Sequence, residues 1–169
     1  MSAGEVTGWI AGSGLPGPVR LTWAGGRITG LTPCPEAAEN LPHLAPPLCD
    51  LQVNGYAGID FQQDHLEVEA LLQAVRALRR DGCTRFLLTL ITDDWPRMVA
   101  RLRHLAGQRR RHPELAAAIV GWHLEGPFLS TEPGYVGAHD PACMVDPTDA
   151  HVDELLALAG DCPLLLTVS

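Results

Sequence analysis

The stretch Gly121-Trp122-His123-Leu124-Glu125-Gly126-Pro127-Phe128-Leu129 decides which fold is expected of this chain. The apolar residues 117–120 lead into it and Gly-Pro interrupts it, which is typical of a buried β-strand that stops at a sharp turn. Side chains alternate along a strand, so His123 and Glu125 share one face and Leu124 takes the other. A carboxylate at the end of a buried strand is costly unless something charged meets it. Glu125 is therefore either a strand-end residue that faces water or part of a charged site.

The sequence around this strand alternates between strand and helix patterns. Apolar runs typical of strands are separated by segments in which apolar residues recur at helical spacing. Continuous apolar strands that alternate with helices predict a parallel sheet covered by helices. An open three-layer sheet and a barrel both satisfy this pattern. We predict strands at 48–54, 85–91, 117–125 and 163–168, and helices from an N-cap at Asp64 to Gly82, from Asp94 to His112, and over 147–160.

The N-terminal part has a different pattern, with short extended pieces and turns over residues 1–44. The runs 19–23 and 27–31 flank Ala24-Gly25-Gly26, which indicates a hairpin because glycine accepts positive φ. Three prolines between residues 42 and 47 then form a stiff boundary. We therefore predict two parts, residues 1–44 and residues 45–169.

Composition indicates a folded globular protein, because 46% of the residues are hydrophobic and 19% are charged. The net charge of −8 argues against a nucleic-acid or anionic-membrane partner, and Arg109-Arg110-Arg111 is interpreted as an exposed helix end. No apolar run approaches the roughly 20 residues that span a bilayer. The five cysteines form no C-x-x-C pair, which favours reduced, mostly buried thiols and a cytoplasmic location; Cys49 and Cys83, beside apolar strands, are predicted to be packing residues.

Three short sequence motifs occur in a fixed order along the chain. Each motif alone is a weak indication of family, but their combination is specific. They are Asp50-Leu51-Gln52-Val53-Asn54-Gly55 with Gly58-Ile59-Asp60-Phe61, then Gly82-Cys83-Thr84 before 88–92, then 123–128 with Gly137-Ala138-His139-Asp140. In this combination the chain resembles the N-acetylglucosamine-6-phosphate deacetylases, a branch of the amidohydrolase superfamily, over essentially its whole length.

The resemblance implies an α/β fold that is the first half of a (β/α)₈ barrel of the TIM type, preceded by strands of a small β-sandwich. Residues 1–44 would supply the sandwich strands, and residues 45–169 the first four strands and three helices of a metal-dependent hydrolase barrel, truncated. A complete barrel of this kind needs about 250 residues. We therefore expect the chain to be an N-terminal fragment that is inactive without the missing half.

The resemblance also implies a site with one divalent metal ion, zinc or iron, for which Glu125 is the only ligand in this chain. Gln52 and Asn54 stand where much of the superfamily has His-x-His. Amides are weaker ligands than imidazole, so a second metal should be lost and the pair should act as hydrogen-bond partners in the metal pocket. Without the resemblance, the pair also fits an ordinary polar strand end before a turn. His123 is interpreted as a hydrogen-bonded interior residue, and the general acid/base aspartate is expected beyond residue 169.

The loop over residues 126–146 is long for an α/β connection, and such loops are usually functional. By resemblance, Gly137, Ala138 and His139 are the substrate-binding candidates. His139 also fits a solvent-facing loop histidine. Members of the family often carry lysine before this motif, whereas this chain has Tyr135-Val136, which argues against a phosphate contact from these two positions.

The implied activity is metal-dependent deacetylation of N-acetylglucosamine 6-phosphate to glucosamine 6-phosphate and acetate, in amino-sugar catabolism. The implied partner is a small-molecule amino-sugar phosphate, and members of the family are commonly homodimers. Two alternatives stay open: a truncated non-catalytic pseudoenzyme or interaction module, and a related amidohydrolase that acts on another N-acetylated amino sugar phosphate. Gln52 and Asn54, together with Glu125, argue against relatives built on His-x-His, such as dihydroorotase-like enzymes.

Overall fold

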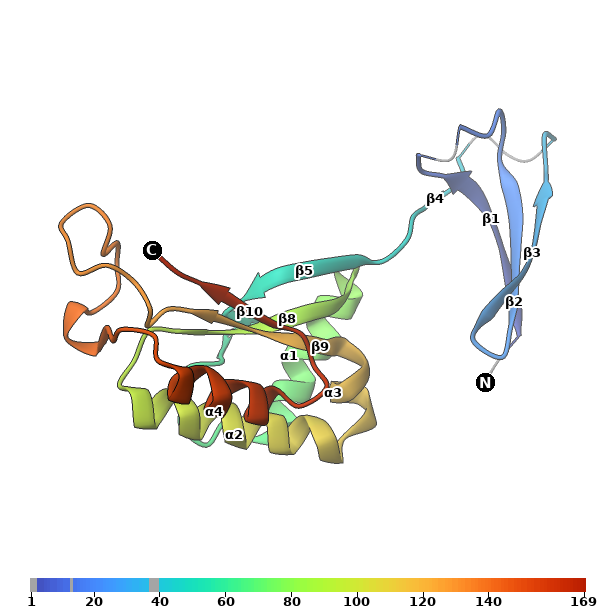
Figure 1. The fold of residues 1–169 in the computed structure, drawn as a ribbon. Coiled ribbons are helices and arrows are strands. Elements are labelled where there is room, and N and C mark those ends of the chain that lie inside the picture. The colour runs from blue at the N-terminus through green and yellow to red at the C-terminus, as the bar shows by residue number, and fades with distance from the viewer. Residues whose placement is uncertain (1–2, 13, 37–39) are drawn as a thin grey trace. The chain divides into compact units, whose positions relative to one another are not determined.

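The computed structural model describes residues 3–12, 14–36 and 40–169, and the chain divides into two compact units, one up to Pro46 and one from Pro47 on (Figure 1). Each unit is built on a separate sheet.

The first unit contains one four-stranded sheet. The predicted hairpin is confirmed: its two strands pair antiparallel, and Gly25 and Gly26 form the turn with φ of 60° and 77°. A further strand pairs antiparallel with the first hairpin strand and parallel with a short strand at its other edge. One sheet does not establish a β-sandwich, so that expectation stays a prediction. In spatial order the strands are β3 (Arg27–Pro33), β2 (Val19–Ala24), β1 (Gly4–Ile10) and β4 (His43–Leu44).

The second unit contains the predicted parallel sheet. Its four strands lie in the order in which they occur in the sequence, and each neighbouring pair is parallel. The strands are β5 (Leu48–Val53), β8 (Cys83–Ile91), β9 (Ile119–Glu125) and β10 (Leu164–Thr167). The helices are α1 (Val68–Arg80), α2 (Trp95–Arg111), α3 (Pro113–Ala118) and α4 (Asp149–Ala159), with a small hairpin of β6 (Gly55–Tyr56) and β7 (Ile59–Asp60) and a 3-10 turn η1 (Pro141–Cys143).

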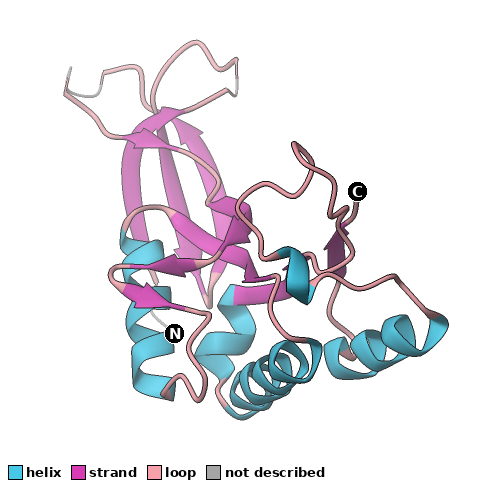
Figure 2. Cartoon of the chain, turned by 90° about the vertical axis from the view of Figure 1, so that its left-hand side faces the viewer, coloured by secondary structure: helices cyan, strands magenta, loops and turns pink. Residues whose placement is uncertain are grey.

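All four α-helices lie on one face of the parallel sheet, as Figures 1 and 2 show from two directions. In a doubly wound open sheet the strand order reverses and helices cover both faces. Sequential order with helices on one side is instead the arrangement of a barrel wall. The structure therefore favours the barrel over the open sheet, a choice that the strand and helix pattern had left open.

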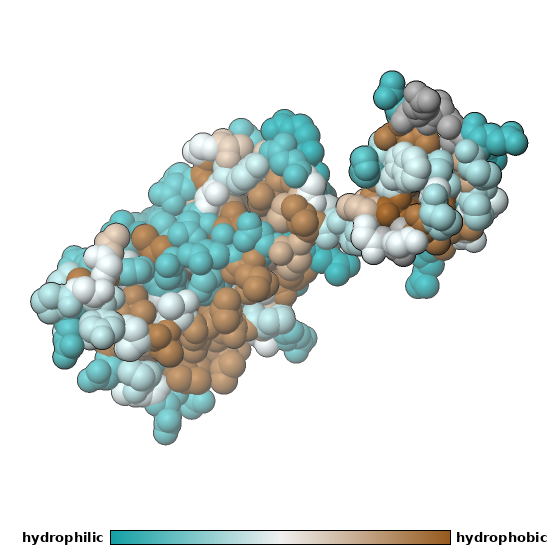
Figure 3. Space-filling model, turned by 90° about the horizontal axis from the view of Figure 1, so that it is seen from above, coloured by the Kyte–Doolittle hydropathy of each residue, from teal (hydrophilic) through white to brown (hydrophobic). Residues whose placement is uncertain are grey.

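The core lies between the sheet and the helices. Trp122 and Leu124 of β9 point into it and are 1% and 0% exposed. Alternation places Gly121, His123 and Glu125 on the opposite face, which the helices do not cover. Figure 3 views the unit from this side, where hydrophilic and hydrophobic residues lie next to one another.

Three details of the structure differ from the sequence-based expectations. Residues 113–118 form the short helix α3, so β9 begins only at Ile119; Pro113 at the first helical position suits a helix start. All five cysteines are free, but only Cys83 is buried. Cys49 is exposed, so its prediction as a packing residue is wrong, because β5 is an edge strand of the sheet.

None of the helices in the described ranges is long and apolar enough to cross a membrane.

Candidate active site

The carboxyl ends of β5 and β9 meet through a hydrogen bond between two of the predicted site residues. Gln52 Nε2 donates to Glu125 Oε2 over 2.7 Å, although the residues lie 73 positions apart. Glu125 is partly buried at the end of β9. Within residues 3–12, 14–36 and 40–169 no cationic side chain pairs with Glu125, and its Oε1 has no hydrogen-bond partner. One face of the carboxylate is therefore held by an amide and the other is available to a ligand.

A second polar layer crosses the sheet on the same face. His123 is 4% exposed and Thr89 of β8 is fully buried. The Thr89 hydroxyl accepts a hydrogen bond from the Val53 backbone N–H (3.0 Å) and lies 3.4 Å from His123 Nδ1. His123 Nε2 lies 2.8 Å from the Thr167 hydroxyl of β10. The four strands are thus joined through side chains, and His123 is the hydrogen-bonded interior residue that the sequence predicts.

Asn54 follows β5 directly. It lines the same cavity as Gln52, and this cavity has a volume of about 440 Å³. Its Oδ1 atom is buried and has no hydrogen-bond partner in the described part of the chain. A buried amide oxygen is costly when unpaired, so this position favours a donor that does not belong to these residues. Gln52 and Asn54 therefore lie together at one strand end, as their spacing predicts.

The backbone of Glu125 is held by Thr92, a residue that the sequence analysis did not single out. The Thr92 backbone N–H and hydroxyl both donate to the Glu125 carbonyl, over 3.0 and 3.2 Å. The next residue, Gly126, has φ of +91°, and a Cβ there would clash with Thr92 Oγ1. Glycine is required at this position for both reasons.

Gln62 is a second residue that sequence reasoning missed. Its Nε2 donates to the Thr89 carbonyl over 3.0 Å, and its Oε1 accepts from the Ile91 backbone N–H over 3.1 Å. No sequence pattern signals this role, because both partners are backbone atoms more than 25 positions away.

The substrate candidates Gly137, Ala138 and His139 lie in the loop between β9 and α4. Gly137 and Ala138 are exposed and His139 is partly buried. The His139 backbone N–H donates to the Val136 carbonyl over 3.2 Å, a local turn within the loop. No hydrogen bond joins these three residues to Glu125 within the described ranges. Their role in substrate binding stays a prediction.

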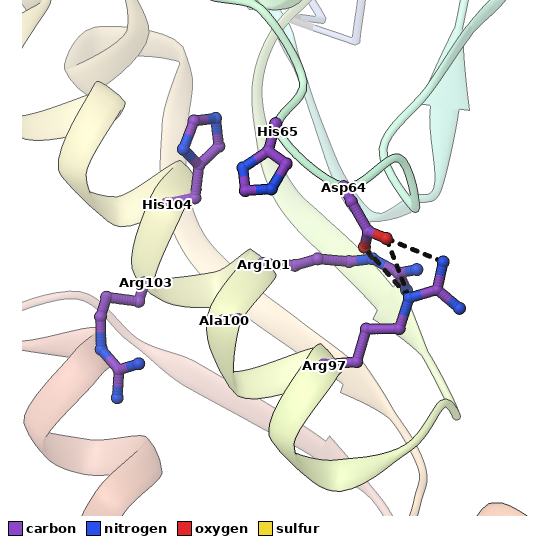
Figure 4. A pocket seen from close by; sticks show the side chains of 7 residues that line it. All are labelled: Asp64, His65, Arg97, Ala100, Arg101, Arg103 and His104. Carbon is purple, nitrogen blue, oxygen red and sulfur yellow. Dashed lines mark hydrogen bonds and ion pairs between the residues drawn. The ribbon is translucent and has the colours of Figure 1, made fainter.

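A separate cavity of about 470 Å³ lies between the loop before α1 and helix α2 (Figure 4). Asp64 is not the N-cap of α1, which begins at Val68; it pairs instead with Arg97 (2.8 Å) and Arg101 (2.7 Å). Arg101 also pairs with Asp93 over 2.6 Å. Hydrogen bonds from the two arginines lower the pKa of Asp64 to about 2. Its contribution to stability is therefore present above pH about 4 and lost as the pH falls toward 2.

Each arginine of this cavity is paired with a carboxylate: Arg97 with Asp64, Arg101 with Asp64 and Asp93, and Arg103 with Glu154. We therefore interpret the cavity as an anchor of the loop onto α2 and not as a second ligand site. In the described residues no group of three or more His, Cys, Asp or Glu side chains lies close enough to hold a metal ion.

No family model matches the chain. Curated proteins do match. An N-acetylglucosamine-6-phosphate deacetylase of Danio rerio is 36% identical over 102 residues, which are 58% of this chain and 24% of the relative. An N-acetylgalactosamine-6-phosphate deacetylase of Escherichia coli O157:H7 is 30% identical over 142 residues, which are 83% of this chain and 36% of the relative.

Solved structures agree with these matches. The N-acetyl-D-glucosamine-6-phosphate deacetylase of Mycobacterium smegmatis superposes with a TM-score of 0.70 at 27% identity, covering 90% of this chain and 42% of that one. A mutant of that enzyme in complex with N-acetyl-D-glucosamine-6-phosphate also gives a TM-score of 0.70.

The chain spans 24% to 42% of the length of these proteins. The likeness includes both the sequence and the arrangement of strands and helices. The chain is therefore a relative of the N-acetylglucosamine-6-phosphate deacetylases of the amidohydrolase superfamily, and its partial coverage of them is consistent with an N-terminal portion.

Proposed function

We propose that this chain is the N-terminal part of a metal-dependent deacetylase that hydrolyses N-acetylglucosamine 6-phosphate to glucosamine 6-phosphate and acetate. The observation that carries the proposal is the hydrogen bond between Gln52 and Glu125, which brings a carboxylate and an amide together at the carboxyl edge of a parallel sheet. Barrel enzymes carry their reacting groups at this edge.

The residues at this edge fit one divalent metal ion. Glu125 offers an anionic oxygen, Oε1, that no cation in the described ranges neutralises. Asn54 offers a buried acceptor without a donor. Glu125 would hold the ion, and when bound the ion supplies a Lewis acid and an activated water for attack on the N-acetyl carbonyl. Two histidines and an acid/base aspartate would come from the longer protein, beyond residue 169.

The chain's own residues then orient and insulate the site. Gln52 donates a hydrogen bond to Oε2 of Glu125, which would leave Oε1 to hold the ion. Asn54 Oδ1 would accept a hydrogen bond from a donor brought to the same edge, and the buried Thr89 and His123 side chains lie beneath Glu125. We further propose that the loop residues Gly137, Ala138 and His139 contact the sugar phosphate.

Several further features are proposed because of the resemblance to the deacetylase family. They are a complete (β/α)₈ barrel of which the β5–β10 sheet is the first half, a small β-sandwich that includes the first unit, a homodimer, and a cytoplasmic location.

The test is to purify the polypeptide encoded by the reading frame that contains these residues, load it with zinc or iron, and measure acetate release. Rapid release from N-acetylglucosamine 6-phosphate, and slow release from unphosphorylated N-acetylglucosamine, is expected. A metal-loaded protein that releases no acetate from any N-acetylated amino sugar phosphate would instead support the non-catalytic alternative.

A second candidate substrate is N-acetylgalactosamine 6-phosphate. The relative named for that substrate matches 83% of this chain, the larger part of it, against 58% for the Danio rerio relative. The two sugars differ only at one hydroxyl-bearing carbon, so the same assay with both phosphates, compared by kcat/KM, separates the two candidates.

Changing Gln52 and Asn54 together to histidine is expected to raise the metal content of the polypeptide from one ion to two per chain. The double variant places two imidazoles at one strand end beside Glu125, and imidazole binds zinc far more strongly than an amide does. The measurement is metal per chain by mass spectrometry after dialysis. A content that stays at one ion would contradict the placement of both residues at the metal pocket.

A further inference from the structure

The end of β8 is left without its neighbour β5. The last paired residues of β5 and β8 are Val53 and Leu88, whereas β8 continues to Ile91. Past this point β5 turns away into the hairpin of β6 and β7. The Thr89 carbonyl and the Ile91 N–H then face the side that β5 has left, because the backbone groups of residues two apart in a strand point the same way.

The primary amide of Gln62 takes the place of the missing strand. It donates to the Thr89 carbonyl over 3.0 Å and accepts from the Ile91 N–H over 3.1 Å, the two bonds that a parallel neighbour would make. Both partners are part-buried. An unpaired backbone group at a buried strand end is costly, so the amide stabilises this end of β8.

Gln62 is itself fixed in place by its neighbours. Phe61 is fully buried and stacks on Phe86 of β8, with ring centroids 6.1 Å apart. The Gln62 backbone N–H donates to Asp60 Oδ1 over 2.9 Å, and two residues further on Asp64 is held by the arginines of α2. The amide therefore reaches β8 from a segment that is anchored on both sides.

The support passes from β8 to Glu125 through Thr92. Thr92 follows Ile91 directly and donates both its N–H and its hydroxyl to the Glu125 carbonyl. Ile91 and Glu125 are themselves register partners. The backbone of Glu125 is thus set by the end of β8, while its carboxylate is held separately by Gln52.

We propose that Gln62 and Thr92 are positioning residues for the Glu125 carboxylate, with Gln62 fixing the end of β8 and Thr92 transmitting that position to the Glu125 peptide. This inference rests on the proposed function, in which Glu125 is a metal ligand. Neither residue touches substrate or metal in this scheme. Each sets the direction in which the carboxylate is presented, and partners outside the ligand sphere commonly change metal affinity by about 10- to 100-fold.

The test uses Thr92→Val and Gln62→Met in the polypeptide encoded by the full reading frame. Both changes keep side-chain size and remove the side-chain hydrogen bonds, while the backbone bond from Thr92 N–H to the Glu125 carbonyl remains in Thr92→Val. We expect the zinc dissociation constant, measured by chelator competition, to rise about tenfold in each. The kcat should fall while the KM for N-acetylglucosamine 6-phosphate changes little. Thr92→Ser, which keeps the hydroxyl, should bind zinc as the unaltered protein does.

A metal-free measurement tests the link between the two residues. Gln62→Met should speed hydrogen exchange at the Thr92 amide in the apo protein, because the end of β8 is then no longer held. Unchanged exchange at Thr92 would overturn the role of Gln62.

Two matched variants control for a general loss of stability. Thr148→Val removes the hydroxyl that caps α4, and Gln63→Met changes the exposed neighbour of Gln62. Both should leave zinc affinity unaltered even if Thr148→Val lowers the melting temperature. Equal zinc affinity in Thr92→Val, Gln62→Met and these controls would overturn the inference.

Glu125→Gln in the same assay separates this inference from the proposed function. If Glu125→Gln does not weaken zinc binding either, the proposed function fails. If only Glu125→Gln weakens it, the positioning roles of Gln62 and Thr92 fail and the proposed function stands.

Discussion

Glu125→Gln in the polypeptide encoded by the full reading frame is expected to release most of its metal and to lower the deacetylation rate by more than about a hundredfold. An effect of this size is expected because changes outside the ligand sphere already lower metal affinity or activity about 10- to 100-fold, and this change removes a ligand. Glutamine keeps the size of the side chain but replaces an anionic oxygen with a neutral amide. The glutamine side chain can still accept a hydrogen bond from Gln52, so we expect the variant to remain folded.

The measurements are metal per chain, rate of acetate release and melting temperature of the apo protein. Glu132→Gln is the matched control, because it makes the same chemical change at an exposed loop carboxylate. Near-normal metal content and rate in Glu125→Gln would show that Glu125 is not a ligand. A loss of metal with an unchanged apo melting temperature would separate a ligand role from a structural one.

A polypeptide of residues 1–169 alone is expected to show no measurable deacetylation, even with added zinc or iron. Glu125 is the one proposed ligand, and no group of three or more His, Cys, Asp or Glu side chains that could hold an ion occurs in the part of the chain that the structure describes. A single carboxylate is a poor site for a divalent ion, because catalytic zinc sites use three protein ligands.

The same polypeptide is also expected to self-associate. β5 and β10 are the two end strands of their sheet, and unpaired strand edges act as templates for association. Leu48 and Leu51 of β5 are 66% and 60% exposed, and Val168 after β10 is 63% exposed. Size-exclusion chromatography, light scattering and binding of a hydrophobic dye measure this behaviour. A clean monomer that unfolds cooperatively and hydrolyses N-acetylglucosamine 6-phosphate would contradict both parts of the prediction.

Hydrophobic periodicity was sufficient to predict the four parallel strands and the three longer helices, because each is packed on at least one face. It could not identify the edges of the sheet. β5 has an apolar pattern like that of β8, yet it is exposed along most of its length, whereas residues 86–90 are buried. Periodicity alone does not say which strand lacks a neighbour, whereas the resemblance to half a barrel places the first and fourth strands at the edges. The expectation for Cys49 was wrong because it rested on the apolar pattern of the strand.

The parts of the candidate site that lie on one strand could be predicted, whereas contacts between residues of different segments could not. Gln52 and Asn54 were placed together because alternation puts residues two apart on one face. Gln62 and Thr92 were missed because their partners are backbone atoms of other strands, which carry no sequence signature. Asp64 was expected to cap α1 because aspartate favours N-caps, but two arginines of α2 offered it a stronger interaction.

The sequential strand order has a consequence for how the chain is made. During translation β5 leaves the ribosome first, and each of β8, β9 and β10 then emerges when the strand beside which it will lie is already outside. Every strand pairing in this sheet can therefore form in the order of synthesis, across a connection that contains at least one helix. Synthesis proceeds at about 5–20 residues per second, whereas a helix forms within about a microsecond. Each helix therefore has time to form, and each strand to pair, before the next strand appears. The sheet is thus suited to vectorial growth on the ribosome, one strand and its helices at a time.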